Sequence, residues 1–270
     1  MKKFLKYVLL LGIVLSMIAG CTNKEKEKAT QSFNHTVTQI KQNNKKLKES
    51  IADVQETISS KKKPLDPNTL TAATTAITKA RVKIVKIPNI PSKTEEIKTT
   101  TKKLNSKLDI TTCLSDLQNS HTNLQNSIKQ LTQVTNPSEA FVVERLTGLP
   151  NITGMEAVTE GNDPNGNLNK QGGYTSTVYF SSDLVNQEDV FGSTIVDKGT
   201  EAGGAIEVYR TEKDAQKRET YLAAFDGAGP FNSGSHKVLG TIVIRTSDKL
   251  AASQQKTLEQ NITNSFITLK

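Results

Sequence analysis

Cys21 and the segment before it carry the clearest chemical signal in this chain of 270 residues. Three lysines lie among the first six residues, an apolar stretch covers residues 7–18, and the small residues Ala19 and Gly20 precede the thiol. A cationic start, an apolar stretch and small residues before a cut are typical of a signal peptide that is removed. The stretch is also shorter than the roughly 20 residues that a membrane-spanning helix needs. We therefore expect a signal peptide at 1–20.

The tetrapeptide Ile18-Ala19-Gly20-Cys21 resembles the lipobox of bacterial lipoproteins. In that family the cysteine thiol receives a diacylglycerol, and cleavage then makes the cysteine the first residue of the mature protein. The resemblance implies lipidation at Cys21 and attachment to the extracellular face of the cell membrane. The alternative is a short transmembrane anchor in which the cysteine is incidental.

The other thiol and the histidines form no pattern typical of a disulfide or a metal site. If Cys21 is acylated, Cys113 has no partner within one chain, and no Cys/His spacing matches a metal site. Cys113 lies in an apolar helical stretch, which predicts a buried structural thiol. His121 occupies an apolar seam as a polar spacer, and as a metal ligand it would have only His35 to join it among the histidines.

Four residues near the carboxyl end, Asp226, Ser233, Ser235 and His236, contain the side chains of a hydrolase triad. A triad also needs an oxyanion hole and a nucleophile that is usually on a strained turn, and no Gly-x-Ser-x-Gly occurs. A helix-to-strand loop explains the same residues. We therefore expect no catalytic residues here, and no P-loop, dinucleotide-binding or zinc-protease motif occurs elsewhere.

Residues 160–169 are dense in oxygen-bearing side chains, with Asp163, Asn165 and Asn167 at alternate positions. This spacing loosely matches a calcium loop, but the glycine and the later glutamate of an EF-hand are missing. A turn held by Asp and Asn hydrogen bonds explains the loop equally simply. These three residues are therefore weak metal candidates, and no metal or other cofactor is expected.

Composition divides the chain after residue 135. Residues 21–135 contain no glycine and a single aromatic residue, Phe33, whereas residues 136–270 hold ten aromatics. The first part has 20 Lys and Arg against 10 Asp and Glu, a net charge of +10, and the second has 12 against 17, a net charge of −5. The basic part is either a solvated helical surface or a site for anionic lipid or wall polymer. We do not expect a nucleic-acid partner.

The first part has the pattern of a coiled coil. After a polar tether at 21–29, apolar residues recur at alternating steps of four and three, with one polar interruption at Asn44. The pattern predicts helices at about 30–62, from Asp66 to about 84, and 94–134, with a change of register near 108–111. We expect these helices to form an elongated antiparallel bundle of about three helices over 30–135.

The second part, 136–270, has the pattern of a small mixed α+β domain. We expect strands at 152–160, 173–181, 205–210 and 236–245, and helices from 138, from 211 and at 249–268. The segment 205–245 is either a βαβ crossover or a pair of strands that lie apart in a mixed sheet. Segments such as Gly203-Gly204-Ala205-Ile206 and Ser233-Gly234-Ser235-His236 resemble a domain found at the end of Gram-positive surface lipoproteins, which implies a secreted module without an assigned activity.

These observations together predict a lipid-anchored protein of the Gram-positive cell surface. It would have a helical spacer and an α+β head that acts by binding an unidentified partner, with no catalysis. One alternative is an exclusion or immunity lipoprotein that blocks a membrane partner, and the least favoured is a wall-active hydrolase. The sequence does not identify the binding residues.

Overall fold

A computed structural model describes the backbone of residues 2–227 and 233–270, and the side chains of residues 23–227 and 233–270. The side chain of Cys21 and those of the predicted signal peptide therefore lie outside the described residues. The chain forms two compact units. We call Met1–Lys62 with Pro67–Gln125 the helical unit, and Lys63–Asp66 with Asn126–Lys270 the head. The boundary thus falls within a helix, before the change of composition at residue 135.

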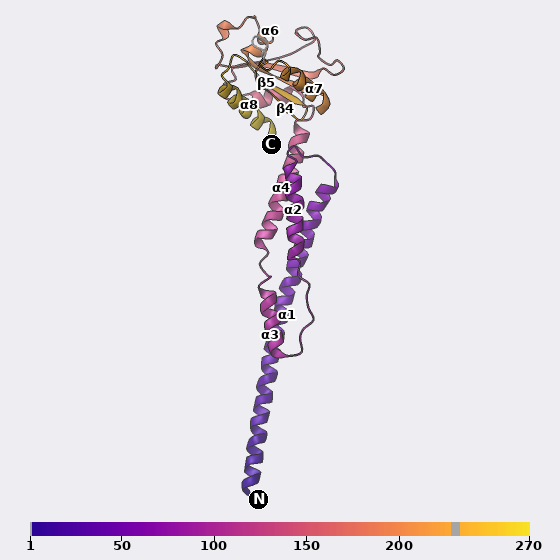
Figure 1. Ribbon diagram of the computed structural model, residues 1–270, viewed down its shortest axis with the longest axis vertical. Helices are drawn as coiled ribbons and strands as arrows, with labels where there is room; N and C mark the ends of the chain where they lie inside the picture. Colours follow the sequence, from indigo (N-terminus) through magenta and orange to yellow (C-terminus); the bar gives the residue numbers. More distant parts are fainter. Residues whose placement is uncertain (1, 228–232) are drawn as a thin grey trace. The chain divides into compact units, whose positions relative to one another are not determined.

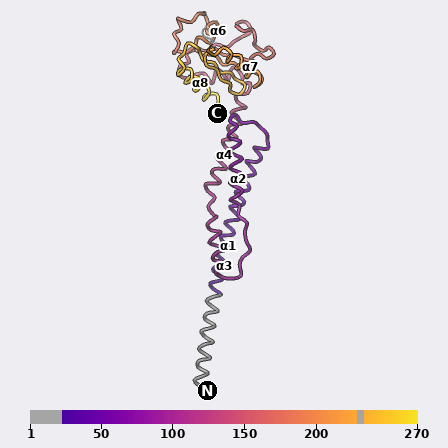
Figure 2. The backbone as a smooth tube through the Cα atoms, viewed as in Figure 1, coloured from indigo at the N-terminus to yellow at the C-terminus, as the bar shows by residue number. Residues whose placement is uncertain are grey.

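The helical unit is built from α1 (Lys2–Ser59), α2 (Asn68–Lys83), α3 (Thr94–Asn105) and most of α4 (Thr111–Gln133), which continues into the head. Helix α2 runs back along α1, and α3 also packs against α1 (Figures 1 and 2). The predicted seam of α1 is buried at Phe33, Ile40, Leu47, Ile51 and Val54. The period of the sequence therefore correctly identifies the face of α1 that forms the core.

Two predictions for this unit are wrong. The expected helix 94–134 is broken between α3 and α4, where Asn43 Nδ2 on α1 donates to the carbonyl oxygen of Leu108 at 2.8 Å. Because the apolar stripe changes phase there, the break allows Leu104 and Leu117 both to be buried. Residues 23–29 of the expected tether are helical and belong to α1, and Ala29 is already buried.

The head contains a five-stranded sheet in the order β1-β2-β3-β5-β4. The strands are β1 (Gly154–Ala157), β2 (Tyr174–Ser181), β3 (Gly203–Tyr209), β4 (His236–Leu239) and β5 (Ile242–Thr246). All neighbouring strands are antiparallel. The single strand predicted at 236–245 is therefore wrong, because Gly240, with φ of +61°, turns the chain back. Strands β3 and β4 are parallel but lie apart, with β5 between them.

Helices cover both faces of this sheet. Helices α5 (Glu139–Leu146) and α8 (Ala252–Ile267) lie on one face, and α6 (Ile195–Lys198) and α7 (Glu212–Ala223) lie on the other (Figure 1). Short 3₁₀ helices occur at Gln187–Asp189 and Gly199–Ala202. The mixture of helices with an antiparallel sheet confirms the α+β class. No helix in the described part of the chain is long and apolar enough to cross a membrane.

Candidate functional site

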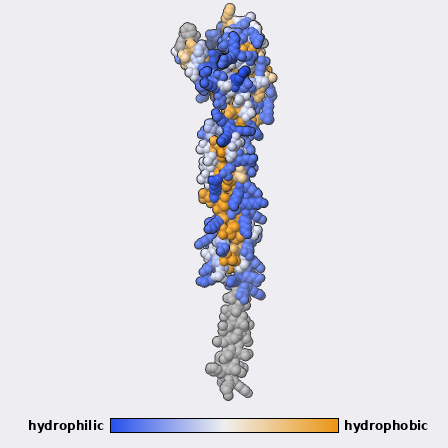
Figure 3. Space-filling view, turned by 90° about the vertical axis from the view of Figure 1, so that its right-hand side faces the viewer, coloured by the Kyte–Doolittle hydropathy of each residue, from blue (hydrophilic) through white to orange (hydrophobic). Residues whose placement is uncertain are grey.

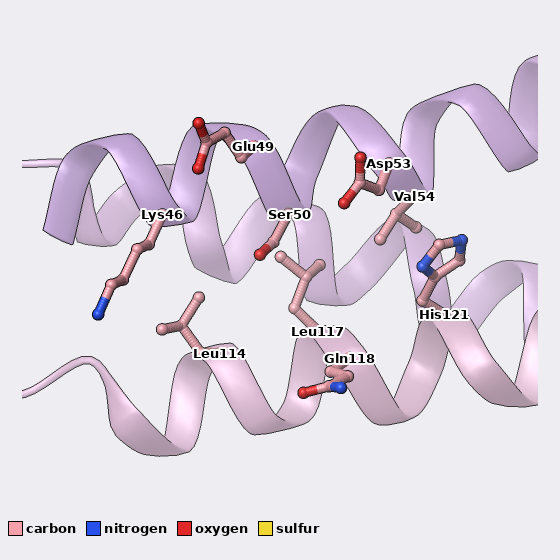
Figure 4. A pocket seen from close by; sticks show the side chains of 9 residues that line it. All are labelled: Lys46, Glu49, Ser50, Asp53, Val54, Leu114, Leu117, Gln118 and His121. Atoms are coloured by element: carbon pink, nitrogen blue, oxygen red, sulfur yellow. The ribbon is translucent and has the colours of Figure 1, made fainter. Parts of the chain in front are cut away.

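A groove between α1 and α4 is one candidate binding surface in the helical unit (Figure 4). Its floor is apolar, because Val54 and Leu117 are almost fully buried. Charged groups on the α1 side, Lys46, Glu49 and Asp53, also line the groove. His121 lies on α4 beside the groove, and its Nε2 is 2.7 Å from Thr57 Oγ1 on α1.

Two other candidate residues of the helical unit, His35 and Cys113, differ in how far they are exposed. His35 is exposed, and no group of three or more His, Cys, Asp or Glu among the described residues could hold a metal ion. Cys113 is a free thiol that is half-buried, where the sequence predicted burial. Burial raises the pKa of the Cys113 thiol, so its reactive thiolate form is disfavoured at neutral pH.

The loop of the weak metal candidates is organised by hydrogen bonds. Asp163 Oδ1 accepts from the Asn165 N–H at 3.0 Å, Oδ2 accepts from the Leu168 N–H at 2.7 Å, and Tyr174 Oη donates to Oδ1. Burial opposes ionisation of Asp163, but these bonds, with one from the Asn167 N–H, outweigh it and lower its pKa. The carboxylate therefore serves as the centre of a turn, and a cation would have to displace these donors.

The four residues with triad side chains do not form a triad. His236 Nε2 and Ser233 Oγ both contact Asp226 Oδ1, at 3.2 and 3.5 Å, so the aspartate lies between the serine and the histidine. Ser235 Oγ instead donates to Glu259 at 2.7 Å. In a triad the histidine must lie between the acid and the nucleophile. The geometry therefore does not support nucleophilic attack by either serine.

A buried charge cluster beneath α7 was not predicted from the sequence. Glu207 on β3 is fully buried and accepts from Arg218 Nε at 2.8 Å and Arg218 Nη2 at 2.9 Å. Arg245 Nη1 on β5 donates at 3.0 Å, and Tyr209 Oη donates at 2.8 Å. The two bonds from Arg218 connect α7 to β3, and the bond from Arg245 connects β5 to β3. The one available signal was a glutamate in the middle of an otherwise apolar strand, whose burial requires paired charges.

The charge state of the cluster follows from these contacts. Burial disfavours the ionised form of Glu207, but Arg245, Arg218 and the Tyr209 hydroxyl outweigh it and lower its pKa. Burial and the neighbouring carboxylate both raise the pKa of Tyr209. The cluster is therefore one carboxylate between two guanidinium groups, with a neutral tyrosine. Such a group is suited to fixing α7 on the sheet.

Comparisons with protein-family models, with curated proteins and with solved structures give no match for this chain. Its function must therefore be argued from its own residues.

Proposed function

We propose that this chain is a lipid-anchored protein of the Gram-positive cell surface whose head acts by binding. The Ile18-Ala19-Gly20-Cys21 segment is the observation that carries the proposal, since it combines a lipobox-like sequence with a preceding apolar stretch. In this proposal the lipid is attached at Cys21 and residues 1–20 are removed. Helices α1 and α2, with the broken pair α3 and α4, serve as an antiparallel helical spacer.

An exposed aromatic side chain in the head supports a role in binding. Phe191 is 97% exposed, although its neighbour Val190 and the nearby Val196 are buried. The loop around it is held by Lys198 Nζ, which donates to the Gln187 carbonyl oxygen at 3.0 Å. A loop fixed by this hydrogen bond thus exposes a large apolar side chain to water. Aromatic residues of this kind are enriched in protein interfaces.

Apolar groups also reach the surface of the helical unit. Leu70, Val82 and Ile90 are 39%, 81% and 44% exposed, and apolar residues form a stripe along the face seen in Figure 3. With a net charge of +10 over residues 21–135, this surface offers both apolar and electrostatic contacts. These features support contact of the spacer with anionic lipid or wall polymer.

The anchoring proposal is tested by changing the two cysteines separately. In a Gram-positive host, the wild-type protein should stay with membranes after a high-salt wash, and mass spectrometry should find a diacylglycerol on an amino-terminal Cys21. Cys21→Ser should lose both properties, whereas the matched Cys113→Ser variant should keep them. Protease added to intact cells should digest the wild-type head. Retention of residues 1–20 in the mature chain would contradict the proposal.

A further inference from the structure

A polar pocket in the head lies where the loop before β2 meets the start of α7. Its lining includes Lys170, Gly172 and Gly173 from that loop, Arg210 from the end of β3, and Asp214 and Lys217 from α7. The pocket shares no lining residue with the groove in Figure 4. It is therefore a separate candidate site.

The charges around this pocket are mainly positive. Lys170, Arg210 and Lys217 contribute three cations against the single carboxylate of Asp214, whose Oδ2 already accepts from Thr211 Oγ1 at 2.6 Å. This excess of positive charge occurs in a part of the chain, 136–270, whose net charge is −5. The pocket thus differs in sign from its surroundings.

The cations at the pocket also differ from most others in the head. Among the described residues, seven of the nine other cations of 136–270 have partners, the exceptions being Lys213 and Lys256. Carboxylates pair with Arg218, Lys237, Arg245, Lys249 and Lys270, and carbonyl oxygens accept from Arg145 and Lys198. Lys170, Arg210 and Lys217 form no side-chain hydrogen bond or ion pair with a described residue. Three cations without a protein partner therefore converge on one pocket.

The loop that forms one wall depends on glycine. A Cβ atom at Gly173 would lie 2.0 Å from the carbonyl oxygen of Asn167, and Gly172 has φ of +77°. Side chains are thus excluded from Gly173 by the fold of the loop. The wall therefore has no side chain at Gly172 and Gly173, and the polar residues Asn169, Gln171 and Thr175 line the pocket beside them.

We propose that this pocket binds a phosphate group. A guanidinium group can donate two parallel hydrogen bonds to phosphate oxygens, and lysine ammonium groups act on the same anion as point charges. A phosphate offers enough charge and oxygen atoms to engage Arg210 and both lysines at once. The inference names a ligand class for the head, and it rests on the proposed binding function. The phosphate could belong to a soluble glycerol phosphate or to a lipid headgroup.

The test is a titration of the full-length protein in nonionic detergent with glycerol 3-phosphate, followed by the amide NMR signals of Gly172 and Gly173. We expect saturable shifts in the wild type. Lys170→Gln, Arg210→Gln and Lys217→Gln should each weaken affinity about two- to fivefold, as exposed charge pairs do, and the triple variant should show no saturation. Affinity should also fall as salt is added.

Lys213→Gln is the matched control, because Lys213 is an exposed lysine on the same helix that does not line the pocket. It should bind as the wild type does. Absence of saturable shifts, or an equal loss in Lys213→Gln and Lys217→Gln, would overturn the inference. The near-UV circular dichroism of the head tyrosines verifies that each variant is folded.

Vesicles distinguish the two sources of phosphate. If phosphatidylglycerol vesicles compete with glycerol 3-phosphate for the wild-type pocket, the headgroup is a ligand. If they do not compete, the soluble phosphate is the ligand, and either result supports the phosphate chemistry. The cysteine variants described above do not alter this pocket, so failure of phosphate binding and failure of anchoring are separate results.

Discussion

Replacing Glu207 by Gln should strongly destabilise the head. The substitution retains the size of the side chain but removes the negative charge that pairs with both Arg218 and Arg245, whose side chains are 21% and 11% exposed. Removing one partner of a buried ion pair typically costs about 3–5 kcal/mol, because the remaining charge stays buried without compensation. Four hydrogen bonds of 2.8–3.0 Å converge on this carboxylate, so we expect a loss in that range.

Urea unfolding followed by near-UV circular dichroism of tyrosine measures this loss in the head alone. Four tyrosines lie in the head, at 174, 179, 209 and 221, and the fifth, Tyr7, lies in the predicted signal peptide. Glu201→Gln is the matched control, since Glu201 pairs with Lys249 at 3.4 Å with both side chains about half exposed. Its cost should be at most about 1 kcal/mol.

A second substitution separates charge imbalance from lost packing. Adding Arg245→Met to Glu207→Gln removes one uncompensated cation, so part of the lost stability should return. If Glu207→Gln costs no more than Glu201→Gln, the cluster does not stabilise the head and the reasoning is refuted. A double variant less stable than Glu207→Gln would show that packing of Arg245 outweighs its charge.

The same cluster gives the head a defined response to acid. The folded-state pKa of Glu207 is lowered from its ordinary value of 4.5, so its contribution to stability is complete above that value. This contribution is lost as the pH falls below 4.5 and through the folded-state pKa. Glu207→Gln has no carboxyl group at this position, so its stability should decrease less steeply with acid than that of the wild type.

Three further substitutions or measurements test other parts of the structure. Asn44→Leu should lower the free energy of unfolding of the helical unit by about 1–3 kcal/mol, because it leaves the N–H and carbonyl of Val85 unpaired. Urea unfolding followed by circular dichroism at 222 nm measures this loss, and an unchanged midpoint would contradict it. Gly204→Ala should unfold or severely destabilise the head, since its Cβ would lie 2.2 Å from a backbone oxygen of β5, whereas Gly161→Ala should be neutral. The rate at which Cys113 is alkylated should rise with pH, with a midpoint above pH 9.0 because its pKa is raised. A midpoint below pH 9.0 would instead show an activated thiol.

Local patterns in the sequence were sufficient to predict most of the helices and strands. The four-and-three spacing on α1 identified buried positions such as Ile40 and Leu47, because a helix repeats its faces at that period. A helix was correctly expected from 211, and Thr211 Oγ1 caps it by accepting from the Asp214 N–H at 3.1 Å. Each of these features depends on residues within a few positions of one another.

Contacts between distant segments could not be predicted in the same way. Asn44 was recognised as a polar interruption of the apolar pattern, but its partner was not identifiable. Its side-chain amide donates to the Val85 carbonyl oxygen at 2.8 Å and accepts from the Val85 N–H at 2.9 Å. Any residue except proline offers such a backbone pair, so only the folded arrangement selects Val85.

The hairpin of β4 and β5 was missed for a different reason. Five of the seven residues 238–244 are apolar, which fits one long buried strand, and the single glycine at 240 is a weak turn signal. The fold reverses the chain at Gly240 and Thr241, and this places Arg245 beside β3. Without the hairpin, the Arg245 contact to Glu207 could not be anticipated.

Helix α7 connects the buried cluster with the proposed phosphate pocket. Lys217 and Arg218 are consecutive residues, and successive side chains on a helix point about 100° apart. Arg218 is thereby bound to Glu207 in the sheet, while Lys217 lines the pocket. Because Glu207 holds the helix through Arg218, it also fixes the position of Lys217 relative to Lys170 and Arg210. Glu207→Gln should therefore weaken phosphate binding without removing any pocket cation, which makes Glu207 a positioning residue for that site.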